Sequence, residues 1–432
     1  MDPSAGVWRH CLEVAANSDI GLRRANNQDS YSIALAGDQA DFGQRGHLFM
    51  VADGMGAHAA GELASKIATD VVSLTYRKLL DQSPPEAILS AMLEANHQIH
   101  TRGQASPDFR GMGTTACTLL LLPAGALVAH VGDSRAYRLR GNRIEQLTFD
   151  HSLVWEMRAS GQFPKGELPS YVTKNIITRS LGPSPTVQVD LEGPAPVLPG
   201  DTFLLCSDGL SGPVLDNELG AVLSCLPPAE AVQALIDLAC LRGGPDNITA
   251  IVVRVLGPQV MKPSDADLSG STAPRSVRPV HGLMWTLLGV TSLAAVGLFA
   301  LGQPIMALGG LAAAVAVGVA VLRQRYGFGQ GEPPAENRRF GRGPYVTCDS
   351  TPSADFLGRL AEIARQLHDA AVSENWAVDW AAFDAHLTDA ATAARAGNLT
   401  DAARAHLRAI TSMMAQLRGQ RTSTSDSGLF NL

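Results

Sequence analysis

The chain has 432 residues and a formal net charge of −7, with 46% hydrophobic and 17% charged residues. This length predicts two or three folding units, because it exceeds what one hydrophobic core ordinarily supports. The acidic balance argues against a nucleic-acid-binding protein, which would normally carry a basic face. The six cysteines show no CxxC pair, so we expect buried, reduced thiols in a cytosolic chain rather than a zinc site or a disulfide framework.

Residues 10–256 alternate short β-type runs with glycine-rich turns. The N-terminus lacks a basic start followed by an apolar run, so we expect no signal peptide and a cytoplasmic location for this region. Runs rich in Val, Ile, Leu and Thr predict strands at 47–53, 114–122, 126–134, 201–209 and 248–255. Apolar residues spaced three and four apart predict helices at 61–80 and 84–102. Residues 150–183 are more polar and predict a mobile helical insert near a site.

Beyond this region the composition changes. Residues 257–281 are rich in Pro, Ser and Gly and predict a linker. Two uncharged apolar segments follow, 282–302 and 305–322, and each is long enough to cross a bilayer as a helix. Basic residues on both flanks predict that both ends face the cytoplasm. The sequence therefore predicts a transmembrane hairpin at 282–322 and a multi-pass inner-membrane protein.

Two alternatives to the hairpin remain open at this point: a buried helical hairpin inside a soluble domain, and a single long span bent at Pro304. After the apolar segments, residues 323–353 predict a second polar linker. Residues 354–419 are alanine-rich and predict a small helical C-terminal domain in at least three segments. The polar residues 420–432 predict a disordered tail.

The candidate site residues in the sequence are mainly aspartates. They lie at the ends of apolar runs or beside glycines, and they are Asp29, Asp53, Asp133, Asp208 and Asp246. An isolated Asp-Gly is usually a simple turn, but here five aspartates occur in five distinct contexts. Converging carboxylates would repel one another unless a cation neutralised them. All-oxygen ligation suits Mg²⁺ or Mn²⁺ better than Zn²⁺.

The order of these contexts resembles one known family, the metal-dependent protein phosphatases of type 2C, especially the bacterial members that oppose serine/threonine kinases. The matching motifs span residues 10–256. They are GLRRANNQDS (21–30), VADGMGAHAAGELAS (51–65), GMGTTA (111–116), HVGDSRAYRLR (130–140), LTFDHSLV (147–154), TRSLG (178–182), LLCSDGL (204–210) and GGPDNITAIVV (243–253).

The resemblance implies an α+β fold, a four-layer αββα sandwich of two antiparallel sheets flanked by helices, in a phosphatase domain at 10–256. It also implies roles for particular residues. Asp53 would bridge two Mn²⁺ or Mg²⁺ ions, Gly54 would offer a backbone carbonyl to one, and Asp208 and Asp246 would complete the other. Asp133, with Asp208, would help to form a third, weaker metal site.

In the same way, the resemblance implies that Asp29 holds a metal-bound water and that Arg24 binds the substrate phosphate. Water activated by the two ions would hydrolyse phosphoserine and phosphothreonine in proteins. The implied partners are phosphorylated proteins, either Ser/Thr kinases or their substrates, and the membrane through residues 282–322, with no nucleic acid.

The sequence departs from the family pattern beside the metal motif. Met55 stands where members outside the bacterial group often have a histidine that is a candidate general acid. His58 and a metal-bound water stay open as proton donors. Gln28 replaces a common acidic residue, and Ala57 replaces a common glycine.

A non-catalytic pseudophosphatase or membrane scaffold is the competing hypothesis. Loss of a metal aspartate would favour it, and none is lost. A phosphatase that acts on a sigma-factor regulator differs only in its substrate.

Overall fold

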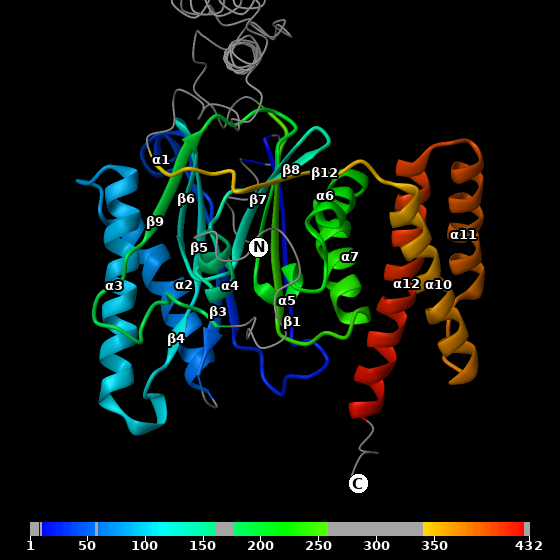
Figure 1. The fold of residues 1–432 in the computed structure, drawn as a ribbon, viewed down its shortest axis with the longest axis horizontal. Coiled ribbons are helices and arrows are strands. Elements are labelled where there is room, and N and C mark those ends of the chain that lie inside the picture. The colour runs from blue at the N-terminus through cyan, green and yellow to red at the C-terminus, as the bar shows by residue number, and fades with distance from the viewer. Residues whose placement is uncertain (1–7, 9–10, 57–58, 160–175, 258–339, 427–432) are drawn as a thin grey trace, which may run out of the picture. The chain divides into compact units, whose positions relative to one another are not determined.

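The structure is a computed structural model that describes residues 8, 11–56, 59–159, 176–257 and 340–426. Two antiparallel sheets pack face to face, with helices on both outer faces (Figure 1). This arrangement confirms the predicted α+β sandwich. The general-acid candidate His58 and residues 160–175 of the predicted insert lie outside the described residues.

The first sheet has the strand order β1-β11-β10-β7-β8-β12. Its strands are β1 (Leu12–Asp19), β7 (Arg135–Arg140), β8 (Arg143–Gln146), β10 (Thr202–Cys206), β11 (Ile248–Val255) and β12 (Val346–Asp349). The second sheet has the order β2-β3-β5-β6-β9, and β4 pairs with β3. Its strands are β2 (Asp29–Ala34), β3 (His47–Met55), β4 (Gly113–Thr114), β5 (Ala116–Leu122), β6 (Gly125–Val131) and β9 (Asp190–Ala195).

Helices cover both sheets. In chain order they are α1 (Gln39–Arg45), α2 (Ala60–Lys78), α3 (Pro84–Ala105), α4 (Leu153–Ala159), α5 (Asp208–Ser211), α6 (Asp216–Cys225), α7 (Pro228–Leu241), α10 (Ala354–Ser373), α11 (Trp380–Arg395) and α12 (Leu399–Asp426), with a short 3₁₀ turn at Pro107–Phe109. The predicted helices at 61–80 and 84–102 correspond to α2 and α3. Ser83 and Glu86 form a capping box that fixes the start of α3.

Three apolar clusters hold these layers together. Phe49 and Phe203, each at most 1% exposed, meet in the cluster between the two sheets. A second cluster fills the space between the β2–β9 sheet and helices α2 and α3. A third lies between the other sheet and α6 and α7, and it continues into α10 and α12 through Phe356 and Leu407. Burial of this kind is the main favourable term in folding.

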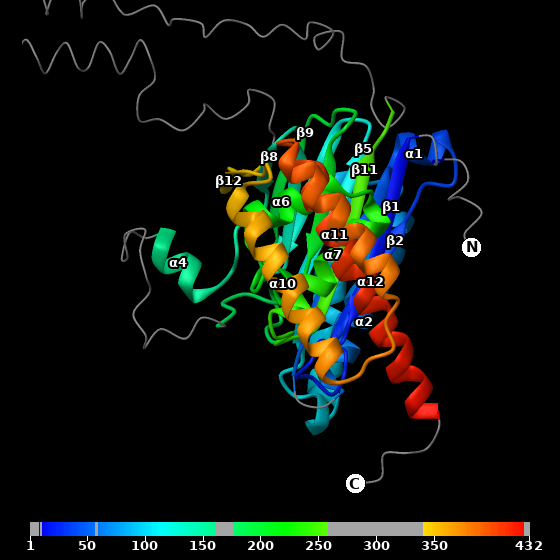
Figure 2. The same ribbon diagram turned by 90° about the vertical axis from the view of Figure 1, so that its right-hand side faces the viewer.

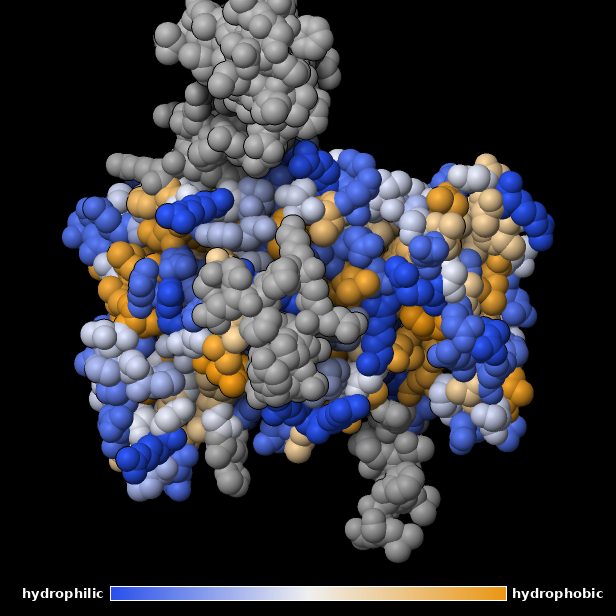
Figure 3. Space-filling view, viewed as in Figure 1, coloured by the Kyte–Doolittle hydropathy of each residue, from blue (hydrophilic) through white to orange (hydrophobic). Residues whose placement is uncertain are grey.

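The C-terminal helices therefore form an additional layer outside α6 and α7 (Figures 1 and 2). Hydrophobic residues are visible along the seam between α12 and α7 in the surface view (Figure 3). Residues 1–262 and 337–432 make up one compact unit. The sequence predicts α10–α12 as helices correctly, but it does not reveal that they dock on the sandwich.

Two predicted boundaries are wrong. The end of the predicted linker at 323–353 contains β12, which pairs antiparallel with β8 and extends the first sheet. This strand escapes sequence analysis because it has four residues and lies in polar surroundings. The predicted disordered tail begins too early, since α12 continues to Asp426. Helix propagation adds one bond per residue, so a formed helix extends into residues of modest propensity.

The prediction of a two-helix inner-membrane protein is not supported, and we withdraw it. In the parts of the chain that the structure describes, no helix is both long enough and apolar enough to cross a membrane. The two segments on which the prediction rested, 282–302 and 305–322, lie outside the described residues. Their apolar composition alone does not establish that they span a membrane.

Candidate active site

Both sheets contribute aspartates to one end of the sandwich. Asp29 begins β2, Asp53 lies near the end of β3, and Asp133 follows β6 after one glycine. From the other sheet, Asp208 follows β10 and Asp246 precedes β11. Because the strands are antiparallel, a strand that starts and a strand that ends can deliver side chains to the same edge. The sheet fixes the backbone, and the turn leaves the carboxylate accessible.

The backbone at this edge is tightly constrained. Asp29 and Asp53 are directly opposite each other in the β2–β3 register, and the Gly54 N–H donates to the Gln28 carbonyl over 3.1 Å. A side chain at Gly54 would meet the Gly61 carbonyl oxygen at 2.1 Å, so only glycine fits there. Gly209, next to Asp208, is similarly close to the Asn247 carbonyl. The glycines therefore allow the segments that carry the aspartates to approach one another.

The aspartates influence one another electrostatically. Burial raises the pKa of Asp29 to about 7, and the charges of Asp208 and Asp246 also raise it. Burial likewise raises the pKa of Asp133 to about 7, with repulsion from Asp208 adding to the effect. The pKa of Asp53 lies well above its usual range because of burial and repulsion from all four other aspartates. These effects indicate that the five aspartates, here called the aspartate cluster, lie near one another at this end of the sandwich.

A divalent cation matches the donor chemistry of this cluster. Three buried carboxylate oxygens have no hydrogen-bond partner among the described residues: Asp29 Oδ1, Asp133 Oδ1 and Asp208 Oδ1. Buried polar atoms are normally satisfied, so three unpaired carboxylate oxygens at one end of the sandwich favour a hard cation. No set of three His, Cys, Asp or Glu side chains in the described ranges is arranged closely enough to hold an ion. The case for a divalent cation therefore rests on the chemistry of the carboxylate oxygens and not on a preformed coordination shell.

Arg24 lies at the edge of this cluster. Its Nη2 donates to Asp246 Oδ2 over 2.6 Å, and its side chain is 48% exposed. The hydrogen bond to Asp246 is the main reason that its pKa is raised, and the charges of Asp53 and Asp208 contribute. Arg23 beside it is exposed, as expected for a solvated charge. The structure thus brings Arg24 together with the predicted carboxylates.

Asn247 holds the Arg24 segment in place, a role that the sequence does not reveal. Its side-chain oxygen accepts from the Gln28 N–H over 2.8 Å. Its amide nitrogen donates to the carbonyls of Ile20 and Asn26 at 2.9 and 3.0 Å. The side chain is only 3% exposed. Asn247 directly follows Asp246. Its buried amide therefore holds both ends of the turn that carries Arg24.

Two hydroxyl side chains fix individual aspartates. Ser207 Oγ donates to Asp29 Oδ2 over 2.7 Å, which connects the two sheets. Thr115 Oγ1 accepts from the Asp53 N–H at 2.8 Å and lies 2.7 Å from Ser134 Oγ. Both residues belong to motifs quoted above, but a motif does not indicate which partner its hydroxyl contacts. Small polar residues adjacent to the aspartates are the signal that could have identified them.

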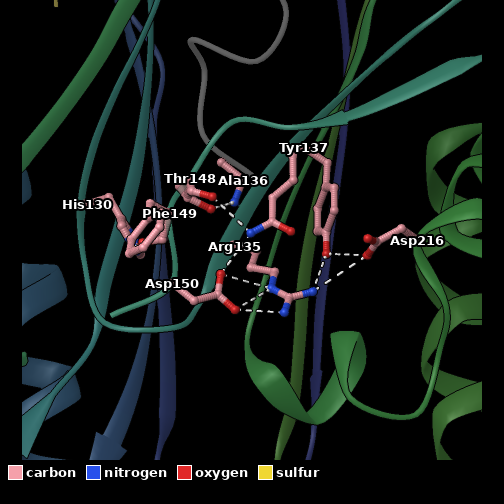
Figure 4. A network of polar contacts seen from close by, with 9 residues as sticks. His130, Arg135, Ala136, Tyr137, Thr148, Phe149, Asp150 and Asp216 are labelled. Carbon is pink, nitrogen blue, oxygen red and sulfur yellow. Dashed lines mark hydrogen bonds and ion pairs between the residues drawn. The ribbon is translucent and has the colours of Figure 1, made fainter. Parts of the chain in front are cut away.

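A polar network supports the segment around Asp133. His151 Nδ1 accepts from the Gly132 N–H over 3.0 Å, and His151 Nε2 lies 2.9 Å from Asp190. Beyond Asp133, Arg135 points toward Asp150, Tyr137 and Asp216, as Figure 4 shows. The pair of Arg135 and Asp150 is mostly buried, at 18% and 5% exposed. Buried charge pairs with full hydrogen bonding restrict the backbone that carries them.

Comparison with known proteins identifies the family of this chain. The sequence model described as "Protein phosphatase 2C" matches residues 23–238, which is half of the chain. This chain belongs to the protein phosphatase 2C family. The match ends before β11, β12 and helices α10–α12.

Relatives of this protein phosphatase 2C domain are bacterial serine/threonine phosphatases. PstP of Mycobacterium tuberculosis is 38% identical over 253 residues, which cover 57% of this chain and 45% of PstP. The chain therefore spans less than half the length of that relative. PhpP of Streptococcus pneumoniae is 37% identical over 248 residues, with 97% of its length covered.

Solved structures of PstP also match the protein phosphatase 2C domain. The structure of PstP/Ppp from Mycobacterium tuberculosis has a TM-score of 0.50 at 35% identity, covering 57% of this chain and 100% of that one. A structure of the PstP catalytic domain in complex with 2 manganese ions has a TM-score of 0.48 at 34% identity, covering 57% and 99%.

Proposed function

We propose that this chain hydrolyses phosphoserine and phosphothreonine in proteins, and that Mn²⁺ or Mg²⁺ is required. The observation that carries the proposal is the set of three buried carboxylate oxygens, on Asp29, Asp133 and Asp208, that have no partner among the described residues, together with the Arg24–Asp246 pair. Membership of the protein phosphatase 2C family supports the same reaction class.

The proposed metal ligands are those that the family resemblance implies. Asp53 and the Gly54 carbonyl would hold one ion, and Asp53, Asp208 and Asp246 would hold the other. Asp133, with Asp208, would serve a third and weaker position. When bound, such ions lower the pKa of water and neutralise charge on phosphoryl oxygens.

The chain's own residues position the substrate. Arg24 binds the phosphoryl group, because its planar guanidinium can donate to two oxygens at once and its half-exposed side chain is open to solvent. Asp29 accepts a hydrogen bond from an attacking water through Oδ1, while Ser207 holds its Oδ2. Orienting the water in line with the leaving Ser or Thr oxygen is the main demand of phosphoryl transfer.

The proposed partners are phosphorylated proteins that serve as Ser/Thr kinases or as kinase substrates. The relatives named serine/threonine phosphatases support this substrate class. The half-exposed position of Arg24 supports it too, because a phosphorylated side chain on a protein surface can reach it.

A metal-dependent assay tests the proposal. Full-length protein should hydrolyse p-nitrophenyl phosphate and a phosphothreonine peptide with Mn²⁺ or Mg²⁺. Asp53→Asn and Asp208→Asn should each lower kcat by about 100-fold or more. Asp70→Asn is the matched control, since Asp70 is an exposed aspartate on α2 that pairs only with Lys66 among the described residues. Full activity in excess chelator, or in either cluster variant, would refute the proposal.

A further inference from the structure

A single arginine on the C-terminal helix contacts two aspartates of the sandwich. Arg418, on α12, donates through Nη2 to Asp237 Oδ1 on α7, and its Nε lies 3.9 Å from Asp19 Oδ2 at the end of β1. Asp237 is fully buried, at 0% exposed, so the guanidinium has a fixed anchor. Arg418 lies outside the segment that matches the family.

Asp19 begins the turn that carries Arg24. Its Oδ1 accepts from the Gly21 N–H over 2.8 Å. Gly21 has φ +77°, and a Cβ there would be 2.2 Å from the Asp246 carbonyl oxygen. The next residue, Leu22, donates its N–H to the Gly244 carbonyl over 2.9 Å. The turn therefore rests directly on the backbone beside Asp246, and a shift at Asp19 would be transmitted to Arg24.

A second connection runs through Gln233 on α7. Gln233 Nε2 donates to Asp237 Oδ1 over 3.1 Å, and its Oε1 accepts from Asn17 Nδ2 on β1 at 3.1 Å. Asp237 thus links α12 to β1 by two routes, one through Arg418 and Asp19 and one through Gln233 and Asn17. In both views of the chain, α12 runs alongside α7 (Figures 1 and 2).

We propose that α12 is a positioning element for the substrate-binding turn, and that Arg418 is its positioning residue. By holding Asp19 against α7, Arg418 keeps Arg24 where it meets the substrate phosphate. This inference rests on the proposed function of Arg24. It also means that displacement of α12 by a binding partner would weaken substrate binding without disturbing the metal aspartates.

The same helix offers a matched control. Arg408 pairs with Glu230 of α7 at 2.8 Å, and both side chains are more than two-fifths exposed. This pair also joins α12 to α7, but among the described residues no hydrogen bond or ion pair of these two side chains reaches β1. Arg408→Gln therefore removes an inter-helix ion pair of the same chemistry while leaving the Asp19 turn alone.

Steady-state kinetics on the full chain with Mn²⁺ and a phosphothreonine peptide tests the proposal. Arg418→Gln should raise KM about fivefold and change kcat little, as expected when an ion pair worth roughly 1 kcal/mol is lost from substrate positioning. Arg408→Gln should keep the KM of the unmodified protein. Arg418→Lys retains the positive charge and should recover most of the lost affinity.

Asp19→Asn tests the same connection from the other side. Asparagine keeps an oxygen to accept from the Gly21 N–H but removes the charge that faces Arg418. Its KM should rise as in Arg418→Gln, and the double variant should raise KM no further than Arg418→Gln alone, because both changes remove the same contact between Arg418 and Asp19. Asp19→Asn also serves if Arg418→Gln fails to fold, since the contact between Arg418 and Asp237 stays intact.

The outcomes separate this inference from the proposed function. If the unmodified chain shows no metal-dependent turnover, the proposed function fails. Amide hydrogen exchange of residues 19–25 then still tests the positioning, and Arg418→Gln must lower protection there more than Arg408→Gln does. If the unmodified chain is active but Arg418→Gln and Arg408→Gln have the same KM, the positioning role is wrong. A fall in kcat and stability with unchanged KM would overturn it equally.

Discussion

Replacing Asn247 by alanine should destabilise the protein and weaken substrate binding together. The substitution removes three buried hydrogen bonds, one to each of Gln28, Ile20 and Asn26. At about 1 kcal/mol for each bond, the free energy of unfolding should fall by about 3 kcal/mol. For a unit of this size, whose entropy of unfolding is large, that corresponds to a fall in Tm of about 4 °C.

The functional effect follows from the position of these bonds, because all three hold the segment that carries Arg24. We expect KM for a phosphothreonine peptide to rise several-fold at temperatures where the variant is folded. Differential scanning calorimetry and steady-state kinetics on the same preparation measure both effects. Asn142→Ala is the control, since Asn142 is exposed and its side chain reaches Asp349 and Thr351 only at 3.4 and 3.2 Å. A Tm within about 1 °C of the unmodified chain, with an unchanged KM, would contradict the assigned role.

Three further predictions concern the same end of the molecule. Gly21→Ala should lower Tm and activity more than Gly200→Ala, because both glycines have positive φ but only Gly21 has backbone within 4 Å of the added methyl; equal effects would show that the contact is unimportant. Mn²⁺ should raise the Tm of the unmodified chain and not that of Asp53→Asn, and an equal rise in both would place the ion elsewhere. Burial raises the pKa of Asp237 to about 6, so this group holds its proton more tightly when folded and stability should fall as pH rises from about 4 to 6. Asp237→Asn should flatten that part of a profile of Tm against pH. An unaltered slope would show that Asp237 does not cause this pH dependence.

The sequence predicts the interior of the sandwich better than its edges. Strands β3, β5, β6, β10 and β11 are almost fully buried, so they stand out as apolar runs. Strands β1, β2, β9 and β12 lie at sheet edges, and their alternation of polar and apolar residues is weak. Edge strands bury less side-chain surface, so composition gives little evidence of them.

The candidate site shows a similar division. The aspartates and Arg24 could be found from ordered motifs, whereas the contacts that hold them could not. Asn247 bonds to Ile20 across 227 positions in the chain, and no local pattern encodes such a partner. The docking of α12 was also missed. The apolar residues Ala403, Leu407, Ile410 and Met413 follow helical spacing and mark a buried face of α12, but periodicity does not indicate which part of the protein covers that face.

The added strand β12 has a practical consequence for anyone shortening this protein. A polypeptide cut at residue 256 would lack the strand that pairs with β8, leaving a row of backbone N–H and C=O groups open to other chains. It would also uncover the side of α6 and α7 that Phe356, Leu407 and Met413 now cover. Unpaired strand edges and exposed apolar helix faces promote aggregation, so a well-behaved fragment that contains the protein phosphatase 2C domain needs residues far beyond the matched segment.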